Sequence, residues 1–213
     1  MTPFFPSPSL AVGYLLACVL LAATPGADMA VFLSRTLSGG RAVGFAAQAG
    51  ANAGLVFHTF AAALGLSALL AASAQAYQAV KIAGALYLLW IALKAIRHGT
   101  ALKRKAEADA GGRRGAFLNG LLINLTNPKI VLFFVTFLPQ FIDARDSHAS
   151  MKLFALGFGF IAITTIVNAM VILLAARLVA GAKQSPRALR LFDYAFAALM
   201  SAFAARLAWS ETR

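Results

Sequence analysis

Two charged residues of this sequence lie inside long apolar segments, where ionisable side chains are costly and usually mark a function. Asp28 is the one acidic residue placed in this way, and Lys129 lies about halfway through a later segment. Asp28 therefore indicates a substrate or proton site. The alternative is structural: Asp28 caps the amides freed by Pro25 or pairs with Arg35. For Lys129 the alternative is an ion pair with Asp28 that only holds two helices together.

A proline accompanies each of these charges. Pro25, followed by Gly26, stands three residues before Asp28, and Pro128 directly precedes Lys129. Because proline removes a backbone donor and clashes with the preceding turn, we expect helix breaks at Pro25, Gly26 and Pro128. A half-helix beginning at Pro128 would present free amides and a positive dipole end beside the Lys129 ammonium, which together suit a carboxylate.

A histidine ends a stripe of small residues. Ala46, Gly50, Gly54 and His58 follow one another at four-residue spacing, which favours close helix packing over a ligand role. His58 titrates near neutral pH, so Asp28 and His58 form a candidate proton relay, with a hydrogen-bonded core histidine as the alternative. Further polar residues inside apolar segments could bind a ligand or simply bond across helices: Asn52, Asn124, Asn127, Thr164, Thr165 and Asn168.

The elements that carry these residues are membrane-spanning helices. Of 213 residues, 61% are hydrophobic and 12% are charged, against about 45–50% and 25% in soluble domains. Six apolar segments approach or exceed the length of about 20 residues that crosses a bilayer: 10–33, 42–72, 77–96, 116–138, 153–178 and 188–209. The second is long, so it could tilt, kink near Gly50 and Gly54, or begin at the membrane surface. We predict an all-α polytopic membrane protein.

A basic linker divides the chain into two halves. We expect one membrane domain built from a three-helix half over 1–98, a basic cytoplasmic loop over 99–115 and a second three-helix half over 116–213. Three spans per half give the two inverted repeats of secondary transporters. Most Lys and Arg residues follow the first, third and fifth spans, so the positive-inside rule predicts that both termini are periplasmic.

Several other function classes have no support in the sequence. The net charge of +12 would suggest nucleic acid in a soluble protein, but here it follows membrane topology, and no basic face carries interleaved aromatics. Cys18 is the only cysteine, which excludes an intrachain disulfide or a cysteine-rich metal site. The sequence contains no HExxH, GxSxG or P-loop motif, so we expect neither an enzyme nor an ATP-driven pump, and no metal or cofactor.

Three stretches of the sequence resemble the LysE/RhtB family of amino-acid exporters. They are TPGADMAVFLSRTLSGGRAVG at 24–44, KIAGALYLLWIALKAIR at 81–97 and FLNGLLINLTNPKIVLFFVTFLPQF at 117–141. They occur in the family's order, and the resemblance covers nearly the whole chain. It implies a bacterial inner-membrane protein with six hydrophobic segments that exports amino acids or their relatives, driven by the proton gradient.

The resemblance also assigns site residues. The family's first-span motif is matched by Thr24, Pro25, Gly26 and Asp28, and its fourth-span motif by Asn124, Asn127, Pro128 and Lys129. Ala27 stands where the family often has proline, which implies a gentler first break. The implied substrate-binding residues are Asp28, Asn124, Asn127 and Lys129. Family members differ in their amino-acid substrates, so the resemblance does not name the solute.

From the sequence we expect an exporter of a small zwitterionic amino acid that works by alternating access. Two alternatives stay open: a structural or partner-binding membrane subunit without transport, and an exporter of a metabolite other than an amino acid. The expected partners are the amino-acid substrate, protons as coupling ion and the lipid bilayer. A homodimer is compatible with the sequence, which does not specify an oligomeric state.

Overall fold

The computed structural model describes residues 8–24, 26–66, 112–142 and 148–175, together with positions 79, 82, 194 and 198. Within these residues all regular secondary structure is helical, with no strand. The all-α prediction is thereby confirmed. The third and sixth expected spans, at 77–96 and 188–209, and the loop at 99–111 fall outside the described stretches.

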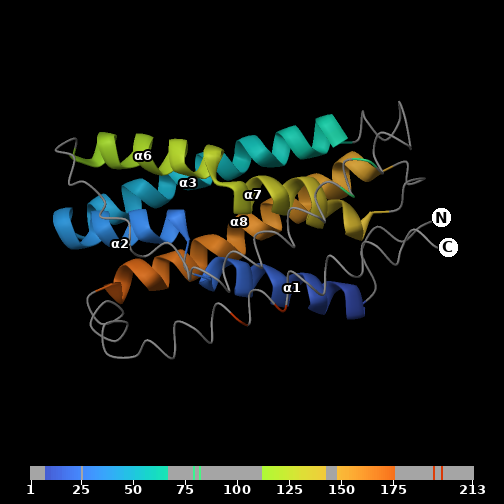
Figure 1. The fold of residues 1–213 in the computed structure, drawn as a ribbon, viewed down its shortest axis with the longest axis horizontal. Coiled ribbons are helices and arrows are strands. Elements are labelled where there is room, and N and C mark those ends of the chain that lie inside the picture. Colours follow the sequence, from blue (N-terminus) through green and yellow to red (C-terminus); the bar gives the residue numbers. More distant parts are fainter. Residues whose placement is uncertain are drawn as a thin grey trace.

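The first half contributes α1 (Pro8–Ala23), α2 (Ala27–Gly39) and α3 (Arg41–Phe60), which continues as the π-helical turn η1 (Ala61–Leu66). The second half contributes α6 (Gly112–Thr126), α7 (Pro128–Leu132), the π-helical turn η2 (Phe133–Phe137), the 3-10 turn η3 (Leu138–Phe141) and α8 (Ala149–Leu173). In Figure 1, α3 and α6 run side by side along one edge of the molecule and α1 lies at the opposite edge, with α8 between them. Helices from both halves therefore pack against each other.

Three spans can be recognised among the described helices. α8 alone is long and apolar enough to cross a membrane. Two helix pairs qualify when each is taken as one bent span: α1 with α2, bent by 49°, and α6 with residues 128–141, bent by 51°. These spans correspond to the first, fourth and fifth segments expected from the sequence. α3 falls short of the same criterion because it carries Gln48, Asn52 and His58, and Gln48 and His58 are buried inside the bundle.

The outer surface of the described helices is apolar. Val12 and Leu16 in α1, Leu122 in α6 and Ile166 and Met170 in α8 are all more than half exposed. A soluble protein would cover such a surface with polar side chains, whereas lipid tails leave it favourable. The surface thus agrees with the polytopic membrane fold.

α3 and α6 touch through their backbones. A Cβ added at Gly50 would lie 1.9 Å from the carbonyl oxygen of Phe117, and one added at Gly120 would lie 2.0 Å from that of Ala47. Only glycine permits an approach this close. α3 is continuously helical through Gly50 and Gly54.

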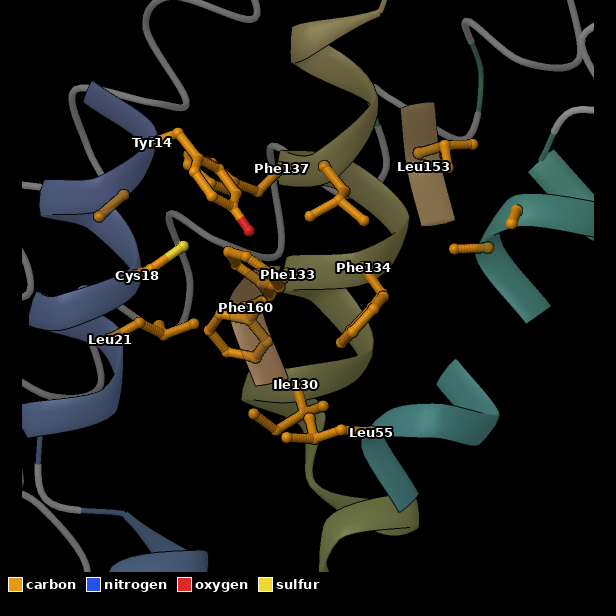
Figure 2. Packing of buried hydrophobic residues seen from close by; sticks show 14 residues of the cluster. Tyr14, Cys18, Leu21, Leu55, Ile130, Phe133, Phe134, Phe137, Leu153 and Phe160 are labelled. Atoms are coloured by element: carbon orange, nitrogen blue, oxygen red, sulfur yellow. The ribbon is translucent and has the colours of Figure 1, made fainter. Parts of the chain in front are cut away.

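An aromatic cluster joins α1, η2 and α8. Figure 2 shows Phe133 and Phe160 stacked at its centre, with a distance of 4.0 Å between ring centroids. The Tyr14 ring meets Phe141 edge to face, and the Tyr14 hydroxyl donates to the carbonyl oxygen of Leu156 in α8. These contacts hold α1, at Tyr14, beside η3 and α8.

Candidate functional site

Asp28 lies in the first turn of α2, where the helix dipole favours a negative charge. Its Oδ2 accepts hydrogen bonds from the side-chain amides of Asn127, at 2.9 Å, and Asn124, at 3.3 Å. Its Oδ1 is buried and has no hydrogen-bond partner among the described residues. The carboxylate is thus anchored to the second half of the chain through one oxygen, while the other oxygen remains available.

Asn127 stands at the break between α6 and α7. α6 ends at Thr126, Asn127 is extended, and α7 begins with Pro128 at its first position. The Asn127 Oδ1 caps α7 by accepting from the backbone amide of Lys129 at 3.0 Å. Because that oxygen is engaged by a donor, the amide nitrogen has to face Asp28. The cap also occupies the backbone amide of Lys129, which is one of the free amides that were expected from the sequence to suit a carboxylate.

Lys129 reaches across to the end of α1. Its Nζ donates to the carbonyl oxygens of Leu21, at 3.1 Å, and Thr24, at 3.3 Å, in the last turn of α1 and just after it. Such terminal carbonyls lack helical partners and attract a cation. An ammonium has three N–H donors, so one remains available. A Cβ on Gly26 would lie 3.2 Å from Nζ, so Gly26 gives the ammonium room. Pro25 lies outside the described residues.

Asp28 and Lys129 line one small cavity. Both side chains are described, and no salt bridge joins them, since each bonds to other partners. The cavity volume is about 20 Å³, whereas a single water needs at least about 10–15 Å³ on this measure. An amino acid would therefore enter only when the walls separate. The other polar residues that line the cavity are Thr24, Asn52, Asn124, Thr164 and Asn168.

Two expected site residues do not line the cavity. Asn127 holds Asp28 from outside it. His58 is buried on α3, with Nε2 3.4 Å from the backbone oxygen of Asn124 and its ring stacked on Phe134. Asn124 therefore stands between His58 and Asp28, and no direct hydrogen bond links the two members of the expected proton relay in the described part of the chain.

Polar side chains join α3 to α8. Bonding across helices was one of the alternatives for Asn52 and Thr165, whereas Gln48 was not singled out from the sequence. Gln48 donates through Nε2 to the carbonyl oxygen of Thr165 at 2.7 Å, and Asn52 donates through Nδ2 to the Thr165 hydroxyl at 3.0 Å. Gln48 and Asn52 are spaced four residues apart and so share one face of α3. That spacing, in a helix otherwise rich in small residues, is the signal that could have identified Gln48.

Comparison with known proteins agrees with this architecture. The sequence profile described as LysE type translocator matches residues 19–211. A homoserine/homoserine lactone efflux protein of Salmonella typhimurium is 30% identical over 200 residues, covering 92% of this chain and 94% of that protein. A Vibrio cholerae protein named only as an uncharacterized membrane protein is 34% identical over 167 residues, covering 78% and 81% respectively. No solved structure matches the chain.

Proposed function

The chain belongs to the LysE type translocator family, and on that basis we propose that it exports homoserine or a closely related zwitterionic amino acid across the bacterial inner membrane. Family membership makes it a membrane transporter of small amino-acid-like compounds rather than an enzyme. One observation supports the zwitterionic substrate: Asp28 and Lys129, which carry opposite charges, line the same cavity without pairing.

In this proposal each end of the substrate meets one charge. The substrate ammonium donates to the unpartnered Oδ1 of Asp28, and the substrate carboxylate accepts the remaining N–H of Lys129. Binding a zwitterion leaves no net charge in the low-dielectric interior, whereas binding a simple amine or a simple acid would leave one charge unpaired. The cavity thus favours a substrate that carries both groups.

The two bent spans supply the movement. Asp28 follows the bend between α1 and α2, and Lys129 follows the bend between α6 and α7, so the site lies where the two proposed inverted repeats meet. Relative movement of the repeats would open the cavity to one side and then the other. On the return step Asp28 takes up a proton in place of the substrate ammonium, which couples export to proton entry. His58 contacts the backbone oxygen of Asn124, whose side chain binds Asp28, so it acts on Asp28 by positioning Asn124 rather than by passing a proton.

Counterflow in proteoliposomes tests this function directly. The purified protein is reconstituted into proteoliposomes that are filled with unlabelled homoserine. Uptake of labelled homoserine is then measured in the presence of each of three competitors. Removal of the ammonium gives 4-hydroxybutyrate, removal of the carboxylate gives 3-aminopropan-1-ol, and removal of the hydroxyl gives 2-aminobutyrate. Loss of a hydrogen bond to a charged group is worth about 1.5–3 kcal/mol, so the first two should compete about 10–150-fold more weakly than homoserine.

The third competitor, 2-aminobutyrate, should compete nearly as well as homoserine because it keeps both charges. Full-strength competition by 3-aminopropan-1-ol would contradict a zwitterion site. Absence of counterflow for every amino acid tried would favour a membrane subunit without transport. Stimulation of efflux by an inward proton gradient, and its loss with an uncoupler, tests the coupling ion separately.

A further inference from the structure

Unpartnered oxygens gather at the cavity. In the described part of the chain, four buried side-chain oxygens have no hydrogen-bond partner, and three of them belong to residues that line the cavity: Asp28 Oδ1, Asn52 Oδ1 and Asn124 Oδ1. The fourth, Gln140 Oε1, lies in η3, and Gln140 is not among the lining residues. Buried acceptors without donors are rare and destabilising, so their concentration at one cavity requires an explanation.

The orientation of the Asn52 amide is fixed by its neighbours. The Thr165 hydroxyl donates its only hydrogen to the carbonyl oxygen of Ile161 at 2.6 Å. It can therefore only accept from Asn52, whose Nδ2 lies 3.0 Å away. A flipped amide would place two oxygens against each other, so Oδ1 is the end of Asn52 that is left without a donor.

Asn124 is oriented differently. Its Nδ2 donates to Asp28, and its Oδ1 lies against α3, where a Cβ added at Gly54 would be 2.6 Å away. The oxygen is thus pressed against the backbone of a neighbouring helix. Asp28 Oδ1 on α2 and Asn52 Oδ1 on α3 remain as the two free acceptors of the cavity.

We propose that Asn52 is a further substrate-binding residue, whose Oδ1 accepts one N–H of the substrate ammonium while Asp28 Oδ1 accepts another. The inference rests on the proposed function and narrows the substrate class to amino acids with at least two N–H donors on the α-nitrogen. Two acceptors that have no donor of their own suit a cationic group that carries several N–H bonds. Thr165 acts as a positioning residue, because it sets the direction in which the Asn52 amide faces.

The test compares homoserine with its N,N-dimethyl derivative, which keeps the positive charge but has a single N–H. Counterflow competition is measured for the wild-type protein, for Asn52→Leu, and for Gln140→Leu as a matched control. Gln140→Leu also removes a buried amide oxygen without a partner, but away from the cavity. For the wild type and the control we expect the dimethyl derivative to bind about 10-fold or more weakly than homoserine.

For Asn52→Leu, homoserine binding should weaken by about 10-fold while binding of the dimethyl derivative changes little, so discrimination between the two shrinks. A purely structural role for Asn52 would weaken both ligands equally and overturn the inference. If Asn52→Leu does not insert into membranes, Thr165→Val provides the second test, since it releases the Asn52 amide and should also reduce discrimination.

The outcomes separate this inference from the proposed function. If the wild-type protein moves no amino acid, the proposed function fails. If it moves homoserine and the Asn52 and Thr165 variants discriminate as the wild type does, only the role of Asn52 fails. Replacing Na⁺ by choline provides one more arm: a Na⁺ requirement present in the wild type and lost in Asn52→Leu would assign these oxygens to a metal cation and overturn the inference.

Discussion

Substitution of Asp28 by asparagine tests the site with almost no change in shape. The side-chain amides of Asn124 and Asn127 both donate to Oδ2 of Asp28. In Asp28→Asn these two donors select the orientation of the new amide, whose oxygen takes the place of Oδ2. The new nitrogen then occupies the place of Oδ1, which is buried and without a partner. The substitution thus turns the free acceptor of the cavity into a donor.

The expected effect on transport is large and the effect on folding is small. A substrate ammonium would lose a charge-assisted hydrogen bond of about 1.5–3 kcal/mol and would also face a donor. We therefore expect homoserine counterflow to require at least about 100-fold more substrate. Stability should change little, because the lost attraction to the α2 dipole, about 0.3–1 kcal/mol, is offset by the removal of a charge from the apolar interior.

The assay is counterflow in proteoliposomes, with thermal unfolding in detergent as the control for folding. A second ligand isolates the ammonium: 4-hydroxybutyrate, which has none, should bind Asp28→Asn at least as well as the wild type, because the variant has no unpaired carboxylate in the cavity. Near wild-type homoserine counterflow by a folded Asp28→Asn variant would refute the assignment. Equal losses for both ligands would indicate a distorted cavity rather than a missing charge.

Three further predictions concern Lys129, the close contact between α3 and α6, and the orientation of the protein in the membrane. Lys129→Met should weaken homoserine counterflow by about 10–150-fold. Counterflow of homoserine lactone should weaken less, because an ester replaces the carboxylate in the lactone. Lys129→Arg should retain only part of the homoserine counterflow, since the planar guanidinium of arginine replaces the compact ammonium of lysine. Gly50→Ala should lower the thermal stability by about 1–3 kcal/mol, because its Cβ would lie 1.9 Å from the Phe117 carbonyl oxygen, whereas Gly13→Ala, with nothing within 4 Å, should not. Reporter fusions should place the 99–115 loop in the cytoplasm and the C-terminus outside, and a cytoplasmic C-terminus would contradict the six-span orientation.

The helical membrane fold could be predicted from the sequence because a bilayer imposes long apolar segments that composition alone reveals. Asp28 and Lys129 could be singled out for the same reason, as charges at a depth where charges are rare. The groups that these two side chains bind could not be predicted. That Lys129 binds the carbonyl oxygens at the end of α1, rather than Asp28, depends on how two bent spans meet, which no local pattern encodes.

The small-residue stripe of α3 shows why packing and binding are linked in this protein. The sequence presented helix packing and a ligand role as alternatives for this stripe. In the structure, Gly50 lets α3 meet the backbone of α6, and Gly54 receives the side chain of Asn124 one turn further along. His58, another turn on, then reaches the Asn124 backbone oxygen. Since Asn124 also donates to Asp28, the contact that brings the two helices together fixes the anchor of the carboxylate. A larger residue at Gly54 would displace that anchor even where the helices stay paired.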